Sequence, residues 1–264
     1  MGTTFIFTVV ILSVLGLLLA VVLFLVAKKF KVEEDPLIDI VEATMPGANC
    51  GGCGFAGCRA FAEACVKTRS LEGKFCPVGG NAVMQKVAAH LGVTVEEKAP
   101  MTAVVRCNGT CANRVRTNEY DGSVSCRIMS SLYSGDTGCR YGCLGGGDCE
   151  KACQFGAIKV NPETLIPEVD EEKCTACGAC VRACPKGIIE LRNKGPKNRR
   201  VYVSCMNQDK GGVARKACSA ACIGCRKCEK VCPFGAITVE NNLSYIDFNK
   251  CKLCRKCVAE CPTG

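Results

Sequence analysis

The cysteines of this chain constrain its fold more than any other residue type. The sequence has 26 cysteines among 264 residues, and the run C-x2-C-x2-C-x3-C-P occurs three times, beginning at Cys174, Cys222 and Cys251. With 48% hydrophobic residues the chain is too apolar to be disordered. The single histidine, His90, cannot supply a repeated set of histidine ligands. Two interpretations remain, a secreted scaffold of disulfides or a chain folded around metal centres.

The N-terminal segment decides between these interpretations. Residues 5–27 contain no charge and no proline, and a helix of that length spans about 34 Å, enough to cross a bilayer core of roughly 30 Å. A cleaved signal peptide would need a basic start and a shorter apolar stretch. Lys28, Lys29 and Lys31 follow the segment, so the positive-inside rule predicts that the remaining chain is cytoplasmic. We therefore expect a single-pass anchor in the cell (inner) membrane and reduced cysteines, which favours metal centres.

The spacing of the cysteines favours iron–sulfur clusters over zinc. Each full run has the spacing of bacterial two-cluster ferredoxins, in which three thiolates hold one 4Fe–4S cluster and the fourth holds its neighbour. A zinc site of four thiolates needs only two C-x-x-C pairs, and neither the third thiol of the run nor the proline after the fourth. We therefore expect 4Fe–4S clusters as the cofactors.

An internal repeat reveals an incomplete copy of the run. Residues 149–158 resemble residues 228–237, and the alignment puts Gly146 where the second copy has Cys225. Gln154 also replaces the proline that follows the fourth thiol elsewhere. We expect Cys139 to supply the missing ligand, because it lies within loop reach of the remaining thiols. The alternative is a three-thiolate site with another ligand or a missing iron.

Pairing the motifs as ferredoxins do, and adding the N-terminal cysteines, gives five sets of four ligands. They are Cys50, Cys53, Cys58 and Cys76 (cluster 1); Cys139, Cys143, Cys149 and Cys184 (cluster 2); Cys153, Cys174, Cys177 and Cys180 (cluster 3); Cys222, Cys225, Cys228 and Cys261 (cluster 4); and Cys232, Cys251, Cys254 and Cys257 (cluster 5).

Six cysteines remain outside these sets. Three of them, Cys107, Cys111 and Cys126, are candidates for a sixth centre that borrows Cys139. A free cysteine is more often a small buried hydrophobe, so the sixth centre stays an alternative. Cys65 follows Cys58 in a helical stretch and is expected in the core. The other two are Cys205 and Cys218, which receive no role.

The net charge of +9 does not indicate a nucleic-acid partner. Five oxidised clusters with four thiolates each contribute roughly −10, so the loaded protein is close to neutral. Five basic residues lie together in a loop that contains Gly and Pro, and two interpretations are open, a docking patch for an acidic redox protein or a solvated turn. They are Arg192, Lys194, Lys197, Arg199 and Arg200.

The sequence contains no catalytic constellation. The segment Gly52–Gly57 matches GxGxxG, but no apolar strand precedes it, so a dinucleotide site is not expected. The apolar N-terminal segment has no titratable residue that could relay a proton or bind an ion. These features predict a carrier of electrons without catalytic residues of its own.

The order of these parts resembles the B subunit of Rnf complexes, which are membrane ferredoxin:NAD oxidoreductases. The N-terminal helix, the segment GANCGGCGFAGC closed by Cys76-Pro77 and the segment ACIGCRKCEKVCPFGAI carry the resemblance, which covers essentially the whole chain. It implies a subunit that accepts electrons from reduced ferredoxin and passes them to membrane-embedded and flavin-bearing partners, while the complex exports Na+ or H+. It also implies that Cys50, Cys53, Cys58 and Cys76 hold a 4Fe–4S cluster.

We expect an α+β fold made of one transmembrane helix, a small helical cluster-binding domain and two tandem ferredoxin-like modules. The boundaries are 1–30 for the anchor, 31–95 for the N-terminal 4Fe–4S domain, 96–138 for a Cys-containing connector, 139–191 for the first module, 192–217 for a basic linker and 218–264 for the second module. Electrons are expected to enter at the C-terminal modules and to leave through the N-terminal domain. Two other functions stay open, a redox sensor or cluster scaffold and an electron-transfer subunit of a different membrane complex.

Overall fold

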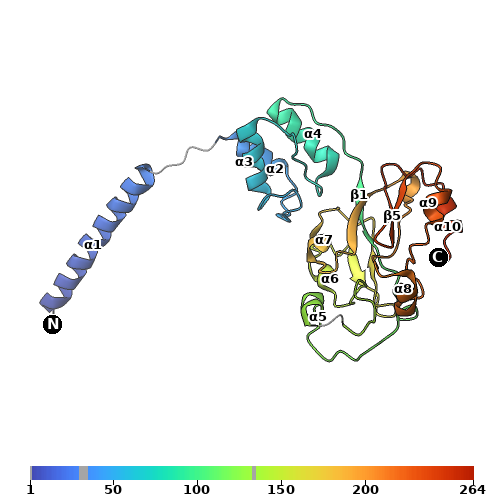
Figure 1. Cartoon of the computed structure of the whole chain (residues 1–264). Coiled ribbons are helices and arrows are strands. Elements are labelled where there is room, and N and C mark those ends of the chain that lie inside the picture. The colour runs from blue at the N-terminus through green and yellow to red at the C-terminus, as the bar shows by residue number, and fades with distance from the viewer. Residues whose placement is uncertain (1, 30–34, 133–134) are drawn as a thin grey trace.

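The computed structural model describes residues 2–29, 35–132 and 135–264 (Figure 1). The first helix, α1 (Gly2–Lys29), contains the apolar stretch Phe5–Lys29, with a mean hydropathy of 3.3 and none of its apolar window buried against the rest of the described chain. A helix that is apolar on all sides and of this length fits a membrane span. Lys31, one of the basic residues expected after the anchor, lies outside the described residues.

Three helices form a compact unit after α1 (Figure 1). They are α2 (Leu37–Thr44), α3 (Cys58–Thr68) and α4 (Gly80–Leu91). Each helix buries an apolar stripe at helical spacing, and Val41, Phe61 and Met84 meet in one hydrophobic core. The core includes Cys65, whose exposed fraction is 0%, so the expectation that this cysteine is a core residue is confirmed.

The larger body begins with a strand from the segment expected to be a connector. Strand β1 (Met101–Val105) pairs antiparallel with β4 (Ile189–Asn193), in the register Met101↔Asn193 to Val105↔Ile189. Ala103 and Val105 are buried with Ile188 and Ile189 in a second core. Residues 96–138 therefore supply a structural strand, because the apolar face of β4 needs a partner that the motif itself does not provide.

Two similar units, each a β-hairpin flanked by two short helices, reflect the internal repeat. In the first, α6 (Asp148–Lys151) and α7 (Ala179–Ala183) flank the hairpin of β2 (Ile158–Val160) and β3 (Pro167–Val169). In the second, α9 (Lys227–Val231) and α10 (Lys256–Ala259) flank the hairpin of β5 (Ile237–Glu240) and β6 (Leu243–Ile246). The second hairpin turns at Asn241-Asn242, with φ of 47° and 61°, the left-handed conformation that a tight two-residue hairpin requires.

Segments far apart in the sequence meet between the two hairpins. Isolated β-bridges join Arg114 to Cys218 and Arg116 to Thr137. The remaining elements are the helices α5 (Cys126–Leu132) and α8 (Gly211–Ala217) and the 3-10 turn η1 (Pro196–Asn198). The mixture of short helices and strands agrees with an α+β fold.

Candidate metal centres

The N-terminal thiols converge at the end of the three-helix unit. Cys58 begins α3, and its backbone N–H donates to the side-chain oxygen of Asn49 at 2.8 Å. Gly79 donates its N–H to the sulfur of Cys76 at 3.3 Å. Burial raises the pKa of Cys76, and the nearby thiols of Cys53 and Cys58 act in the same direction. Thiols that raise one another's pKa and accept hydrogen bonds from backbone N–H groups suit a 4Fe–4S cluster. The cluster replaces the thiol protons, and the N–H···S bonds stabilise the resulting thiolates.

The thiols expected for cluster 3 line one cavity of about 340 Å³, counted with its open mouth. Burial raises the pKa of Cys180 to about 11, with contributions from the thiols of Cys174 and Cys177. Backbone N–H groups of Ala103 and Ala157 donate to the sulfurs of Cys174 and Cys153, at 3.5 and 3.3 Å. All four members of the expected set, Cys153, Cys174, Cys177 and Cys180, are therefore together.

The structure differs from the sequence-based expectation for cluster 2. A Cβ atom built on Gly146 would lie 3.0 Å from the sulfur of Cys126, so Cys126 occupies the place of the missing ligand. Burial raises the pKa of Cys143 to about 12, with contributions from the thiols of Cys107, Cys126 and Cys149. Burial likewise raises the pKa of Cys149 to about 12, with contributions from Cys126 and Cys184. The thiols that gather here are Cys126, Cys143, Cys149 and Cys184, with Cys126 in place of Cys139.

Asp148 holds Cys126 in this position. Its carboxylate accepts the backbone N–H of Arg127 and the hydroxyl of Ser125, both at 3.0 Å, so it caps the N-terminus of α5. Although partial desolvation opposes it, these hydrogen bonds and one from the backbone of Cys126 lower the pKa of Asp148. Asp148 is also the first residue of α6, so one side chain ties the Cys126 segment to the incomplete motif.

The thiols of the C-terminal motifs line two cavities that are close to the surface. One is lined by Cys222, Cys225, Cys228 and Cys261, and the other by Cys232, Cys251, Cys254 and Cys257. Burial raises the pKa of Cys228 and of Cys257, and in each case thiols of the same expected set contribute. Three of these cysteines, Cys225, Cys254 and Cys261, are exposed. The expected sets of clusters 4 and 5 are thus each together, with exposed members.

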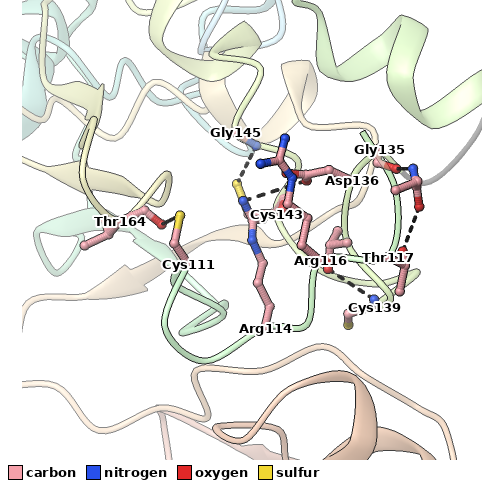
Figure 2. A network of polar contacts seen from close by, with 12 residues as sticks. Cys111, Arg114, Arg116, Thr117, Gly135, Asp136, Cys139, Cys143, Gly145 and Thr164 are labelled. Atoms are coloured by element: carbon pink, nitrogen blue, oxygen red, sulfur yellow. Dashed lines mark hydrogen bonds and ion pairs between the residues drawn. The ribbon is translucent and has the colours of Figure 1, made fainter. Parts of the chain in front are cut away.

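The expected grouping of Cys107, Cys111 and Cys126 does not form. Cys111 is exposed, and its sulfur contacts the carbonyl oxygen of Thr164 at 3.7 Å (Figure 2). Cys126 belongs with Cys143 and Cys149, as described above. Cys107 accepts the backbone N–H of Cys143 at 3.4 Å and lies instead near Cys139. Spacing along the chain misled the expectation, because the fold turns Cys111 outward.

In the described part of the chain, no three histidine, cysteine, aspartate or glutamate side chains come close enough together to hold a single metal ion. A cubane cluster places its four thiolates around the corners of a cube, whereas one zinc ion draws them into a single small tetrahedron.

The basic loop is not the surface patch that the sequence suggested. Arg192 has an exposed fraction of 1% and pairs with Glu190, and its guanidinium lies 5.2 Å from the ring centre of Tyr245. Arg200 pairs with Glu171, whose backbone oxygen accepts a hydrogen bond from Lys194. Arg192 and Arg200 are thus held in ion pairs within the fold, which does not favour a docking role for them. Only Lys197 and Arg199 of this group are exposed.

Family models match the chain where these cysteines lie. A model described as a 4Fe-4S dicluster domain matches residues 138–211 and 221–264, and a model described as a putative Fe-S cluster matches residues 45–78. Together with the geometry above, these matches define a multi-cluster 4Fe–4S protein with an apolar N-terminal helix.

Curated relatives cover nearly the whole chain. The B subunit of the Na+-translocating ferredoxin:NAD+ oxidoreductase complex of Acetobacterium woodii is 48% identical over 96% of this chain and 74% of its own length. The B subunit of the proton-translocating complex of Clostridium ljungdahlii is 44% identical over 99% of this chain and 91% of its own. The B subunit of the ion-translocating oxidoreductase complex of Methanosarcina acetivorans is 43% identical over 99% and 97%. The chain belongs to this family, the B subunits of Rnf complexes, and is an electron-transfer subunit of a ferredoxin:NAD oxidoreductase.

Proposed function

We propose that this subunit takes electrons from reduced ferredoxin at its C-terminal centres and delivers them, through the N-terminal centre, to the membrane-embedded and flavin-bearing partners of the complex. Bound 4Fe–4S clusters supply one-electron carriers of low potential. The observation that carries the proposal is the gradient of exposure. Cys225, Cys254 and Cys261 are exposed at the C-terminal end, whereas Cys58 and Cys76 are buried beside the helices that follow the anchor.

We propose five ligand sets for these clusters. They are Cys50, Cys53, Cys58 and Cys76; Cys126, Cys143, Cys149 and Cys184; Cys153, Cys174, Cys177 and Cys180; Cys222, Cys225, Cys228 and Cys261; and Cys232, Cys251, Cys254 and Cys257. The N–H···S bonds and the mutual effects of the thiols on their pKa values support these sets. The two units with hairpins are then the two ferredoxin-like modules, with β1 completing the first.

Neighbouring sets lie in contact, as electron transfer along the chain requires. A Cβ on Gly52, in the loop of the N-terminal set, would lie 2.8 Å from the backbone oxygen of Cys177. The thiol of Cys180 contributes to the raised pKa of Cys149, so the ligand sets of clusters 2 and 3 lie close together. The thiol of Cys228, in cluster 4, likewise contributes to the raised pKa of Cys257, in cluster 5.

An acidic ferredoxin has a complementary surface at the exposed C-terminal centres. Lys252, Arg255 and Lys256 surround Cys254, and all three side chains are exposed. Arg226 and Lys227 are exposed beside Cys225. A positive surface of this kind steers an acidic redox protein toward the exposed clusters, most strongly at low salt.

The anchor and the soluble part have separate roles in this proposal. Residues 5–27 have no titratable side chain, so ion movement belongs to other subunits. Lys28, Lys29 and Lys31 favour a cytoplasmic position of the clusters, where reduced ferredoxin is available.

The test measures ferredoxin oxidation by the full-length protein. Replacing Lys252 and Lys256 with Glu should raise the KM for ferredoxin and flatten its dependence on salt, while Lys159→Glu, on the exposed side of β2, serves as the matched control. Cys53→Ala should leave ferredoxin oxidation by the isolated protein intact and stop transfer to the complex. An unchanged KM in the charge-reversed variant, or transfer that survives Cys53→Ala, would overturn the proposed route.

A further inference from the structure

Four cysteines outside the ferredoxin-type runs meet between the two modules. They are Cys107, Cys139, Cys205 and Cys218, which come from four separate parts of the sequence. A Cβ built on Gly109 would lie 3.4 Å from the sulfur of Cys107 and 3.8 Å from that of Cys218. Burial raises the pKa of Cys218, and the thiols of Cys107 and Cys139 raise it further. Burial raises the pKa of Cys205 to about 11, and the thiol of Cys107 contributes to this rise.

The buried residue Asn207 donates hydrogen bonds to two of these sulfurs. Asn207 has an exposed fraction of 1%. Its side-chain amide donates to the sulfur of Cys139, and its backbone N–H donates to the sulfur of Cys205, each at 3.4 Å. The N–H of Cys143 donates to Cys107 at 3.4 Å, so Cys107, Cys139 and Cys205 each accept an N–H group. Donors of this kind stabilise thiolates rather than neutral thiols.

The four sulfurs line a cavity of the size found at the ferredoxin motifs. Its volume, counted with its open mouth, is about 380 Å³, against about 340 and 310 Å³ for the cavities at clusters 3 and 5. Four cysteines line each of the cavities at clusters 3 and 5, and five line this one, because Cys143 borders it in addition to the four. The space is therefore similar to that at clusters 3 and 5, whereas the cavity at cluster 4 is larger, about 860 Å³.

A buried cation accompanies this set of thiols. The side chain of Arg114 is 6% exposed, lines the cavity and lowers the pKa of Cys107 and of Cys218, although burial raises both overall. Its guanidinium donates to the carbonyl oxygen of Cys143 at 2.8 Å and lies 4.0 Å from the carboxylate of Asp136 (Figure 2). A fixed positive charge beside two buried and two half-buried cysteines would offset the negative charge that a 4Fe–4S cluster carries.

The position of the four sulfurs fills a gap between clusters 2 and 4. The N–H of Cys143, a ligand in the proposed cluster 2, donates to Cys107. The N–H of Cys222, a ligand in the proposed cluster 4, donates to Cys205. Each module thus donates one of its backbone N–H groups to a sulfur of this site.

We propose that Cys107, Cys139, Cys205 and Cys218 bind a sixth 4Fe–4S cluster that joins the two modules into one path for electrons. One electron arrives from the neighbouring set on one side and one leaves to the set on the other, so no further reactant is needed. This site rests on its own four cysteines, whereas its bridging role rests on the proposed function.

The test counts iron and acid-labile sulfide in full-length protein prepared without oxygen. Cys139→Ser and Cys218→Ser should each remove about four irons, and the double variant should remove the same four, because the two residues share one cluster. Combining Cys218→Ser with Cys126→Ser should remove about eight, since Cys126 serves another cluster. Cys111→Ser, at an exposed cysteine, is the control and should lose none.

The outcomes separate this inference from the proposed function. Full iron in Cys139→Ser and Cys218→Ser, or a zinc ion in place of four irons, would overturn the sixth cluster. Retention of iron by Cys126→Ser and Cys222→Ser would instead overturn the proposed ligand sets. Should a serine variant fail to fold, Asn207→Asp keeps all four thiols and the Oδ1 acceptor used by Asp209. It should keep the iron content and lower the potential of one EPR-active centre, and unchanged potentials in all centres would contradict the site.

Discussion

Replacing Cys126 with alanine tests the least expected ligand in the chain. The sulfur of Cys126 lies 3.0 Å from the point where a side chain on Gly146 would begin, so it supplies the thiolate that the incomplete motif lacks. Cys139 does not take its place, because its sulfur lines the cavity shared with Cys107, Cys205 and Cys218, and Cys111 is exposed. We expect Cys126→Ala to lose one cluster, about four of roughly 24 irons per chain if all six sites fill.

The loss has a physical cause that the structure makes explicit. Burial raises the pKa of Cys143 and of Cys149 to about 12, so both revert to neutral thiols when the fourth thiolate is missing. With only three thiolates left to bind it, the cluster is readily lost, and the freed Cys143 and Cys149 take up protons.

The assay is iron and sulfide content together with the EPR spectrum of the reduced protein. Cys111→Ala provides the matched control, since it removes a thiol that is exposed and outside every set. Full iron in Cys126→Ala, combined with a loss in Cys139→Ala that matches the spectrum expected for cluster 2, would refute the assignment and restore Cys139 as the ligand.

Three further predictions concern single residues. Gly146→Ala should lower the free energy of unfolding by about 1–3 kcal/mol, measured by thermal unfolding, because its Cβ would lie 2.7 Å from the backbone nitrogen of Cys126; an unchanged Tm would contradict the close packing. Gly52→Ala should keep its iron yet slow electron transfer between the N-terminal centre and cluster 3, followed by stopped-flow spectroscopy, because the added Cβ forces the loop away from Cys177; an unaltered rate would argue against this contact as the route. Cys65 should resist iodoacetamide at pH 8 in the folded protein, since burial raises its pKa to about 11 and keeps it protonated until the pH approaches that value; mass spectrometry that finds it alkylated as fast as the exposed Cys111 would contradict the burial.

The sequence was sufficient for the parts of the site that are local. The ferredoxin-type runs that begin at Cys174, Cys222 and Cys251 bring their thiols together through loops of a few residues. Spacing alone therefore predicts which thiols gather, as it does for Cys180 with Cys174 and Cys177. The apolar helix followed in the same way, from the length of one uninterrupted stretch.

The sequence was less reliable where contacts between residues far apart along the chain decide which thiols gather and which side chains are exposed. Cys126 lies 20 positions from Gly146 along the chain, and long-range contacts such as the cap that Asp148 provides bring the two together. The signal was present, since Gly146 marked a missing ligand and Cys126 lay outside the five expected sets. Charge was misread for a related reason, because Arg192 looks like a surface residue in a basic loop until its packing against Tyr245 is known.

One measurement tests the central claim most directly, the iron and sulfide content of the whole protein with Mössbauer spectra of the same sample. If these thiols hold cubanes in all the sets, oxygen-protected protein should contain about 24 irons and as many sulfides, all with the spectrum of 4Fe–4S clusters. Protein that is colourless, or that binds zinc in place of iron at the ferredoxin-type motifs, would contradict the account.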